Sequence, residues 1–386
     1  MNVSMVKKEK CCGCTACKSV CPVAAICMKS DNQGFLHPEI DEVKCIDCGL
    51  CVHICEDKEQ QKKPVKGAFA AKNINDDVLI QSSSGGVSHA LCKTIIDANG
   101  VVYGVAYNAQ HVVILKRARN IEECDAFYGS KYVQADPRQT LQQVYEDLQS
   151  GRSVLFFGTS CLIAGLLSYL NSEKGDTTNL YTVDLICHGV PSPMLFAEYI
   201  SFINKNRKLV RFDFRTKKLP WGYGSKNFGC TITYKEGKEE TDSAKARLFL
   251  NLFFSNNCLR PRCHQCEFAG LDKPADLTLA DYWGCAEAEP EFFDEMGVSA
   301  VLVHTEKGEL LLRQSDELIL ADTTIEKVSR KQGNLDHPSP ASESREVFWK
   351  LYSEKGFLAI AKKYGGYDLK GKLKQTKIYK LVRNMH

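Results

Sequence analysis

The amino-terminal fold is decided by CCGCTACKSVCP (residues 11–22) and CIDCGLCVHIC (residues 45–55). Both stretches contain the spacing C-x2-C-x2-C-x3-C, which begins at Cys11 in the first and at Cys45 in the second. Ten of the 19 cysteines of the chain lie between Cys11 and Cys55. This density and the repeated spacing predict a small unit that is stabilised by bound metal.

The spacing is typical of bacterial ferredoxins with two 4Fe-4S clusters, in which the fourth cysteine of each run binds the cluster of the other run. The first cluster is therefore predicted to take Cys11, Cys14, Cys17 and Cys55. The second is predicted to take Cys45, Cys48, Cys51 and Cys21. Pro22 follows the first run, whereas Glu56 follows the second, so the second run departs from the usual ending.

Zinc is the alternative metal for these cysteines, because four thiolates also suit a tetrahedral zinc site. Zinc sites usually join two C-x2-C pairs across a spacer. A close triple of cysteines with a distant fourth favours the iron–sulfur cluster instead. Cys12 and Cys27 fall outside the pattern and are interpreted as packing or surface residues.

Length and composition predict a cytoplasmic protein of several domains. The 386 residues exceed what one compact core normally holds, and 44% of them are hydrophobic. The net charge of +3 gives no sign of nucleic-acid binding. Residues 1–10 are polar and lack the apolar region of an export signal, and the longest apolar run, residues 154–170, is broken by Gly158 and Gly165. We therefore expect neither secretion nor a transmembrane segment.

A charged stretch, residues 56–66, separates the amino-terminal unit from a body with α/β character. Apolar runs of β type at residues 78–80, 101–107, 112–115, 154–157 and 180–185 alternate with helical patterns. The predicted fold class is an α+β ferredoxin module followed by an α/β flavin-binding domain and a short helical carboxy-terminal tail. The predicted domain ranges are 1–62, 68–336 and 337–386.

Three junctions in the body carry candidate site residues. The first is a serine–glycine loop whose amides and hydroxyls suit a phosphate at a helix amino terminus, although such loops are often plain turns: Ser82, Ser83, Ser84, Gly85 and Gly86. The other two place Cys161 and Cys187 where a strand is followed by a helix. His188 and Asp281 are candidate catalytic residues, although a loop histidine held by its neighbours is the simpler reading of His188.

Three more thiols lie within nine residues, at Cys258, Cys263 and Cys266. Three clustered thiols need a fourth partner, so we predict a third 4Fe-4S cluster completed by Cys161, with Cys187 as the alternative. Buried thiols without a metal are the competing interpretation. Arg260, Arg262 and His264 flank two of these cysteines, which argues against simple burial of Cys263 and Cys266.

Several motifs together resemble the coenzyme F420 hydrogenase/dehydrogenase beta-subunit family. They are SSSGGV (82–87), VVYGVAY (101–107), GSKYVQAD (129–136), FGTSCLIAGL (157–166), DLICHGVPSP (184–193), CLRPRCHQC (258–266) and TLADYWG (278–284). The resemblance runs from about residue 68 to residue 336, with a ferredoxin module fused in front. Ser160 departs from the proline that the family usually has before its cysteine.

The resemblance implies FAD and a 4Fe-4S cluster in the body, and it adds Lys131 and Tyr132 to the serine–glycine loop as FAD contacts. It implies an FAD-dependent oxidoreductase that passes electrons between iron–sulfur clusters and an organic substrate such as a deazaflavin. The alternative is an electron-relay subunit without its own catalysis. Expected partners are a ferredoxin or a second oxidoreductase subunit.

The last segment, residues 346–386, holds ten Lys or Arg and three Asp or Glu residues. This basic tail could dock an acidic ferredoxin. The simpler reading is a solvated helical face that packs its aromatic residues on the body.

Overall fold

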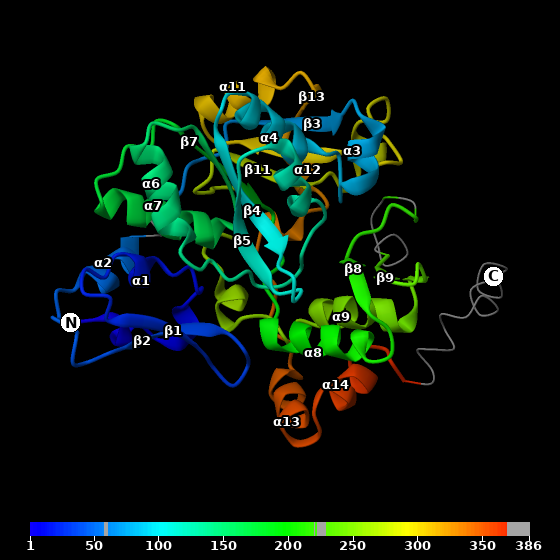
Figure 1. Ribbon diagram of the computed structural model, residues 1–386. Coiled ribbons are helices and arrows are strands. Elements are labelled where there is room, and N and C mark those ends of the chain that lie inside the picture. The colour runs from blue at the N-terminus through cyan, green and yellow to red at the C-terminus, as the bar shows by residue number, and fades with distance from the viewer. Residues whose placement is uncertain (58–60, 220, 222–228, 369–386) are drawn as a thin grey trace.

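The computed structural model describes residues 1–57, 61–219, 221 and 229–368 (Figure 1). Its centre is a mixed sheet of eight strands in the order β13-β3-β12-β11-β7-β6-β4-β5. Their bounds are β3 Gly67–Asn73, β4 Val101–Tyr107, β5 Val113–Ala118, β6 Val154–Phe157, β7 Leu180–Leu185, β11 Leu277–Asp281, β12 Ser299–Val303 and β13 Leu318–Thr323. The pairs β4–β6, β6–β7 and β7–β11 are parallel, and the other pairs are antiparallel.

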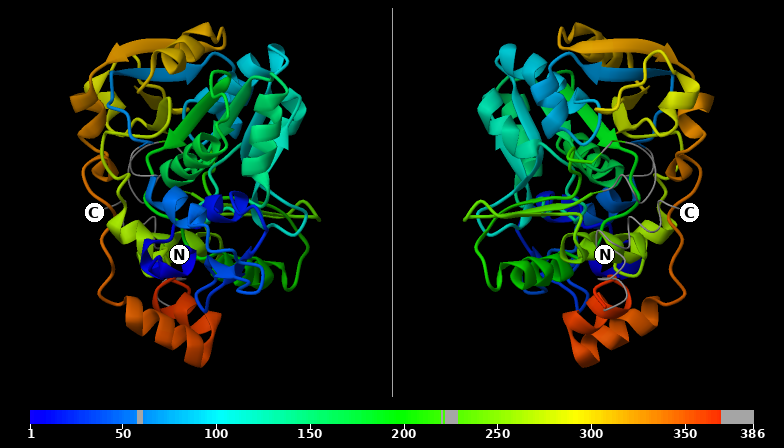
Figure 2. Two further views of the ribbon diagram at one scale, coloured as in Figure 1. Left: turned by 90° about the vertical axis from the view of Figure 1, so that its left-hand side faces the viewer. Right: turned by 90° about the vertical axis from the view of Figure 1, so that its right-hand side faces the viewer.

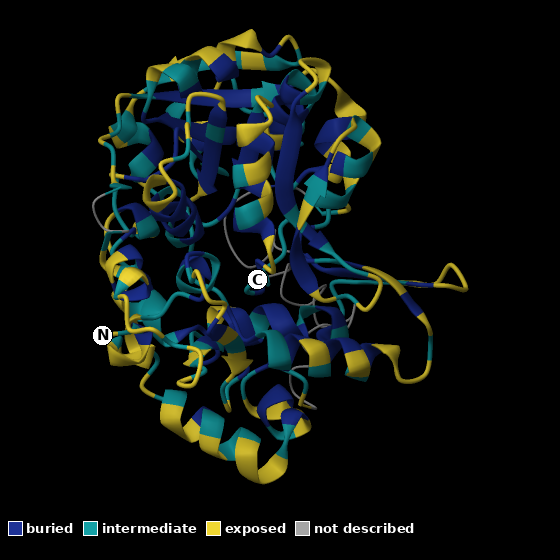
Figure 3. Cartoon of the chain, turned by 60° about the vertical axis from the view of Figure 1, so that its left-hand side comes forward, coloured by how far each residue is buried: buried dark blue, intermediate teal, exposed yellow. Residues whose placement is uncertain are grey.

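Helices cover both faces of this sheet, as an α/β sheet with buried strands requires. One face packs on α4 (Val87–Asp97), α5 (Ile121–Cys124) and α11 (Glu306–Gln314). The other face packs on α6 (Thr140–Gln149) and α7 (Ser160–Ser172). Further along that face lie α10 (Cys285–Ala288) and α12 (Ile325–Ser329). Figure 3 shows the strands mostly buried and the outer faces of the helices exposed.

The amino-terminal unit lies beside α6 and α7 (Figure 1). It contains an antiparallel pair, β1 (Ile26–Ser30) and β2 (Leu36–Ile40), and two short helices, α1 (Ala16–Ser19) and α2 (Leu50–Glu56). Two turns of 3-10 helix precede them, η1 (Val3–Met5) and η2 (Lys8–Lys10). Both α1 and α2 pack against α7, so the unit and the body share one hydrophobic core.

A second lobe lies below the large sheet (Figures 1 and 2). Its strands are β8 (Leu209–Asp213), β9 (Thr231–Tyr234) and β10 (Glu239–Thr241), which form an antiparallel sheet. Its helices are α8 (Pro193–Asn204), α9 (Ala244–Phe254), α13 (Arg345–Lys355) and α14 (Phe357–Lys363). They share an aromatic-rich core, in which Phe348 and Phe357 of the tail are buried.

The structure corrects one element of the sequence prediction. Residues 78–80 are not a strand but lie in helix α3 (Asp76–Gln81), so the serine–glycine loop joins two helices. The Asn75 side chain caps α3 by accepting from the Asp77 amide, and two aspartates occupy its first turn. The strand that precedes this region is β3, which ends before the cap.

The predicted basic tail is described only to residue 368, where α13 and α14 pack on the second lobe. Most of its lysines lie outside the described residues. Within the described part of the chain, no helix is long and apolar enough to cross a membrane.

Candidate functional site

A cavity of about 160 Å³ lies in the amino-terminal unit and is lined by the cysteines predicted for the first cluster. These are Cys11, Cys14, Cys17 and Cys55. The first three come from the loop before α1 and from α1 itself, whereas Cys55 comes from the end of α2. The helix–helix contact of α1 with α2 therefore brings the distant fourth cysteine to the first run.

The two cysteine runs share an unusual backbone pattern. In the first run Gly13 and Thr15 have φ of 75° and 65°, and in the second run Asp47 and Gly49 have φ of 51° and 79°. These residues flank the second cysteine of each run. A left-handed residue on each side turns backbone N–H groups toward one concave side, which is the arrangement that binds anionic iron–sulfur centres.

The cysteines predicted for the second cluster differ in burial: Cys51 is buried, and Cys21 and Cys45 are half-buried. Burial raises the pKa of Cys51, and the neighbouring sulfurs of Cys48 and Cys21 raise it further. The Ala25 amide donates to Cys21 Sγ at 3.2 Å. Cys48 is exposed to solvent, so this second site reaches the protein surface.

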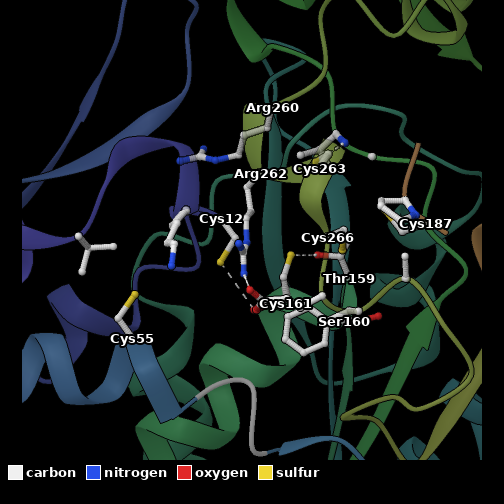
Figure 4. Close-up of a pocket in the computed structure, with 18 of the residues that line it drawn as sticks. Cys12, Cys55, Thr159, Ser160, Cys161, Cys187, Arg260, Arg262, Cys263 and Cys266 are labelled. Carbon is white, nitrogen blue, oxygen red and sulfur yellow. Dashed lines mark hydrogen bonds and ion pairs between the residues drawn. The ribbon is translucent and has the colours of Figure 1, made fainter. Parts of the chain in front are cut away.

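A larger cavity, of about 460 Å³, lies between the amino-terminal unit and the body (Figure 4). Its lining includes six cysteines: Cys12, Cys55, Cys161, Cys187, Cys263 and Cys266. Cys12 and Cys55 also line the smaller cavity. The two cavities are therefore neighbours that share part of their walls.

The topology of the large sheet explains how two of these thiols meet. Because β6 and β7 are parallel neighbours, their carboxyl ends lie at the same edge of the sheet. Cys161 lies in the first turn of α7, shortly after β6, and Cys187 lies two residues after β7. Both thiols therefore lie at the carboxyl edge of these two strands.

The other two thiols come from the turn η5 (Pro261–Gln265) and the residue after it. This segment pairs with the loop that follows Cys187, through a bridge between Pro191 and Leu259. The Val190 amide donates to Cys263 Sγ at 3.4 Å. The pairing of the two loops brings Cys263 and Cys266 to the same cavity as Cys187 and Cys161 (Figure 4).

The structure differs from the sequence prediction at Cys258. This residue is 0% exposed, does not line the large cavity, and packs in the aromatic-rich core. Its sulfur lies 3.3 Å from the Leu252 carbonyl oxygen at the end of α9. Cys187, which the prediction gave as the alternative to Cys161, lines the cavity together with Cys161. Two residues that the sequence did not single out for the site, Cys12 and Arg260, are also there.

The thiols of the large cavity share one environment. The contact with Cys12 and burial together raise the pKa of Cys161 well above its usual value. Burial and the nearby Cys266 raise the pKa of Cys187 to about 11, and burial and Cys187 raise that of Cys263 to about 12. Such thiols stay protonated at neutral pH until a metal displaces the proton.

The lining of the large cavity carries more positive than negative charge. Five Lys or Arg residues line it, Lys7, Lys10, Arg260, Arg262 and Lys273, against the two acids Glu56 and Glu267. Arg260 and Lys273 are 1% and 2% exposed. A 4Fe-4S cluster with four thiolates is an anion, so both the donor atoms and the charge of this cavity fit a cluster.

The thiols predicted for the first cluster line the smaller cavity, and Cys161, Cys187, Cys263 and Cys266 line the larger one. Among the described residues, no three His, Cys, Asp or Glu side chains converge closely enough to hold a single metal ion.

The serine–glycine loop is committed mainly to contacts within the protein. The hydroxyls of Ser82 and Ser84 donate to the carbonyl oxygens of Val78 and Val298. The Gly85 amide donates to Ser299 Oγ at 3.0 Å. A Cβ on Gly85 would lie 2.4 Å from the Ala71 carbonyl oxygen, so close packing on β3 already requires this glycine. The predicted phosphate role of these two hydroxyls therefore has no support in their contacts.

Three of the predicted residues nevertheless meet around a residue that the sequence did not indicate, Arg215. Its guanidinium donates to Asp281, to the Tyr132 hydroxyl at 3.2 Å and to the Ser83 carbonyl oxygen at 3.3 Å. Lys217 donates to the Ser84 carbonyl oxygen at 3.1 Å. Two cations and one carboxylate thus meet beside the loop, an excess of positive charge that suits a diphosphate.

Aromatic rings border this network. Trp221 and Trp283 are stacked with centroids 5.3 Å apart, and the Trp221 indole donates to Asp281. The Arg215 guanidinium lies over the Trp283 ring at 5.4 Å. Residues 220 and 222–228, next to Trp221, lie outside the described residues. Aromatic walls with a few convergent polar groups are typical of sites for ring-containing cofactors.

Lys131 does not join the network. Its ammonium donates to the carbonyl oxygens of Ala126 and Tyr128, at 3.0 and 2.8 Å. Desolvation lowers the pKa of Lys131 to about 7.

The two predicted catalytic residues occupy different places. His188 lines the large cavity, where Asn256 and Ser339 hydrogen-bond its two ring nitrogens at 2.7 and 3.1 Å. Asp281 belongs to the Arg215 network. Phe253 connects the two, because its ring stacks on Tyr132 at 5.0 Å and meets the His188 ring edge-on at 5.0 Å.

Part of the body is similar to a known protein family. Residues 151–326 match the carboxy-terminal part of the beta-subunit family of coenzyme F420 hydrogenase/dehydrogenase. This range, a little under half of the chain, includes Cys161, Cys187, Cys263, Cys266 and Arg215. The match confirms the resemblance seen in the sequence over these residues, which are similar to a subunit of redox enzymes.

A curated protein and a solved structure are also similar to this chain. The chain is 34% identical over 67 residues to the "Uncharacterized protein in rpl9-rpl11 intergenic region" of Porphyra purpurea, across 17% of this chain and 77% of that protein. The two belong to one family, although that name states no activity. A structure of the F420-reducing NiFe hydrogenase complex from Methanosarcina barkeri matches 76% of this chain and 94% of its own, at 13% identity and a TM-score of 0.48. A likeness at that level carries no argument about function.

Proposed function

We propose that this protein is an iron–sulfur oxidoreductase in which three 4Fe-4S clusters form a path for electrons. The third cluster is bound by Cys161, Cys187, Cys263 and Cys266. The observation that carries the proposal is the large cavity, whose wall combines these four thiols with Cys12 and Cys55 of the first-cluster cavity. Neighbouring cavities that share wall residues support direct electron transfer between the first and third clusters.

The order of the sites supports a path between the surface and the interior. The second site reaches solvent at Cys48, the first lies between it and the body, and the third is lined by residues of the body. A redox partner such as a ferredoxin or a second oxidoreductase subunit would exchange electrons at Cys48. Each cluster carries one electron at a time, so no proton or chemical group needs to move along this path.

The Arg215 network is the proposed site of FAD. Arg215 and Lys217 would compensate the charge of the diphosphate, and Tyr132 and Trp283 would pack against its rings. When bound, FAD supplies the conversion between hydride transfer and single-electron transfer. Phe253 lies between this network and His188 of the large cavity, so the proposed flavin site and the third cluster are close neighbours. An organic substrate, with a deazaflavin as one candidate, would react there.

Iron, sulfide and flavin content of anaerobically purified protein tests the proposal. We expect about twelve irons and one FAD per chain, because each cubane holds four irons. About eight irons without flavin would contradict both the third cluster and the oxidoreductase assignment, and would leave a relay protein.

A matched pair of variants tests the ligand set. Cys187→Ala removes a proposed ligand and should lower the content to about eight irons. Cys258→Ala removes a thiol of similar sequence context that lies in the core, and should keep about twelve irons. The opposite result would return the assignment to Cys258.

A further inference from the structure

Arg260 is a buried cation whose hydrogen bonds all go to uncharged groups. Only 1% of the surface of this residue is exposed to solvent. Nε donates to the Cys11 carbonyl oxygen at 2.6 Å, Nη1 to Gln134 Oε1 at 2.9 Å and Nη2 to the Leu36 carbonyl oxygen at 2.8 Å. Burying a charge without a counter-charge is costly, so such an arginine points to an anion close by.

The same residue belongs to the proposed third-cluster site. The Arg260 amide donates to the Val190 carbonyl oxygen at 2.9 Å, and the Cys263 amide donates to the Arg260 carbonyl oxygen at 2.9 Å. Its backbone thus holds together the two loops that carry Cys187 and Cys263. Its side chain lines the large cavity.

The side chain reaches the loop that carries the first cluster. Cys11, whose carbonyl it binds, is a proposed ligand there. Gly13, in the same loop, packs tightly on this side chain. A Cβ at this position would lie 2.9 Å from Arg260 Nη1 and 2.6 Å from Gln134 Nε2. Gln134 also donates to the Cys12 carbonyl oxygen at 2.9 Å. Hydrogen bonds of Arg260 and Gln134 therefore connect the loop of Cys11 and Cys12 to the segment that contains Cys263.

We infer that Arg260 is a positioning residue that fixes the first cluster beside the third and whose charge favours the reduced form of both. This inference rests on the proposed function. A cluster that accepts one electron from an external reductant gains one negative charge, and no bond forms or breaks. A fixed positive charge in a low-dielectric interior stabilises that added charge and raises the midpoint potential.

Redox titration of the intact protein, followed by electron paramagnetic resonance with dithionite as reductant, tests the inference. Arg260→Gln keeps hydrogen-bonding capacity but removes the charge. It should lower the midpoint potentials of the first and third clusters and leave that of the second cluster unchanged. Arg260→Lys keeps the charge and should return both potentials toward those of the unsubstituted protein. Arg313→Gln, at an exposed surface pair with Glu309, is the control and should change none.

The outcomes separate charge from structure. Loss of iron in Arg260→Gln but not in Arg260→Lys also supports the inference, because these variants differ in charge. Unchanged potentials in Arg260→Gln, or identical behaviour of the two variants, would overturn it. Fewer than about twelve irons in the unsubstituted protein would instead contradict the proposed function, before any variant is compared.

Discussion

Gly165 shows at the residue level how closely the amino-terminal unit approaches the body. It lies in α7, and a Cβ there would be 2.7 Å from Cys14 Sγ and 2.8 Å from Cys14 Cβ. No side chain larger than hydrogen fits between this helix and a proposed ligand of the first cluster.

Gly165→Ala should therefore displace Cys14 and either lower the iron content by about four per chain or destabilise the protein by about 1–3 kcal/mol. Gly67→Ala is the matched control, because a Cβ at Gly67 meets nothing within 4 Å. Iron analysis and denaturant unfolding report the two effects. Equal behaviour of the two variants would show that the approach of α7 to Cys14 is not tight.

Lys131 makes stability depend on pH. Its pKa is about 7 in the folded protein and near 10.5 when unfolded, so between these values the unfolded chain binds the extra proton. Stability attributable to Lys131 should rise with pH through this window and be lowest below pH 7.

Lys131→Met should remove that rise, which we expect to be about 1–2 kcal/mol between pH 6.5 and pH 8.5. Unfolding midpoints of the two proteins at both pH values measure it. A constant difference between the proteins across this range would show that Lys131 keeps its charge in the folded state.

Sequence reasoning singled out Cys161, Cys187, Cys263 and Cys266, which line one cavity, but it grouped Cys258 with them although that residue lies in the aromatic-rich core. Cys258, Cys263 and Cys266 look alike in spacing, yet the end of α9 turns Cys258 into the aromatic-rich core. Spacing reports proximity along the chain and not the direction of a side chain. The contacts of Arg260 and Arg215 could not be predicted from the sequence, because both side chains bind residues more than sixty positions away in the chain.

At the level of elements, the parallel order of β6, β7 and β11 accounts for the position of the site. Cys161 and Cys187 come shortly after β6 and β7, and Asp281 is the last residue of β11. All three therefore lie at the carboxyl edge of the parallel strands, where α/β sheets usually bind ligands. The alternation of strand and helix predicted β4, β6 and β7 well. It failed at α3, because a short apolar run does not distinguish a helix from a strand until its cap is recognised.

The two helices α13 and α14 belong structurally to the second lobe, where Phe348 is 0% exposed. Phe348→Ala should destabilise the protein by about 3–5 kcal/mol, because it leaves a cavity in the aromatic-rich core. The neighbouring Val347 is 52% exposed, and Val347→Ala should change stability by less than about 0.5 kcal/mol. Denaturant midpoints compare the two. A mild effect of Phe348→Ala would mean that the tail contributes little to the fold.

On the scale of the whole molecule, the amino-terminal unit and the body adjoin at their cysteine-lined cavities. The unit contributes Cys12 and Cys55 to the wall of the large cavity, and the body contributes Arg260 to the first-cluster loop. This exchange of residues across the contact supports a single electron path in preference to two independent redox units.

Anomalous diffraction at the iron absorption edge, on crystals grown without oxygen, tests the central claim most directly. The account predicts three iron clusters of four irons each. The third cluster should be bonded to Cys161, Cys187, Cys263 and Cys266 and lie next to the one bonded to Cys11. Iron confined to the amino-terminal unit, or a third cluster bonded to Cys258, would contradict it.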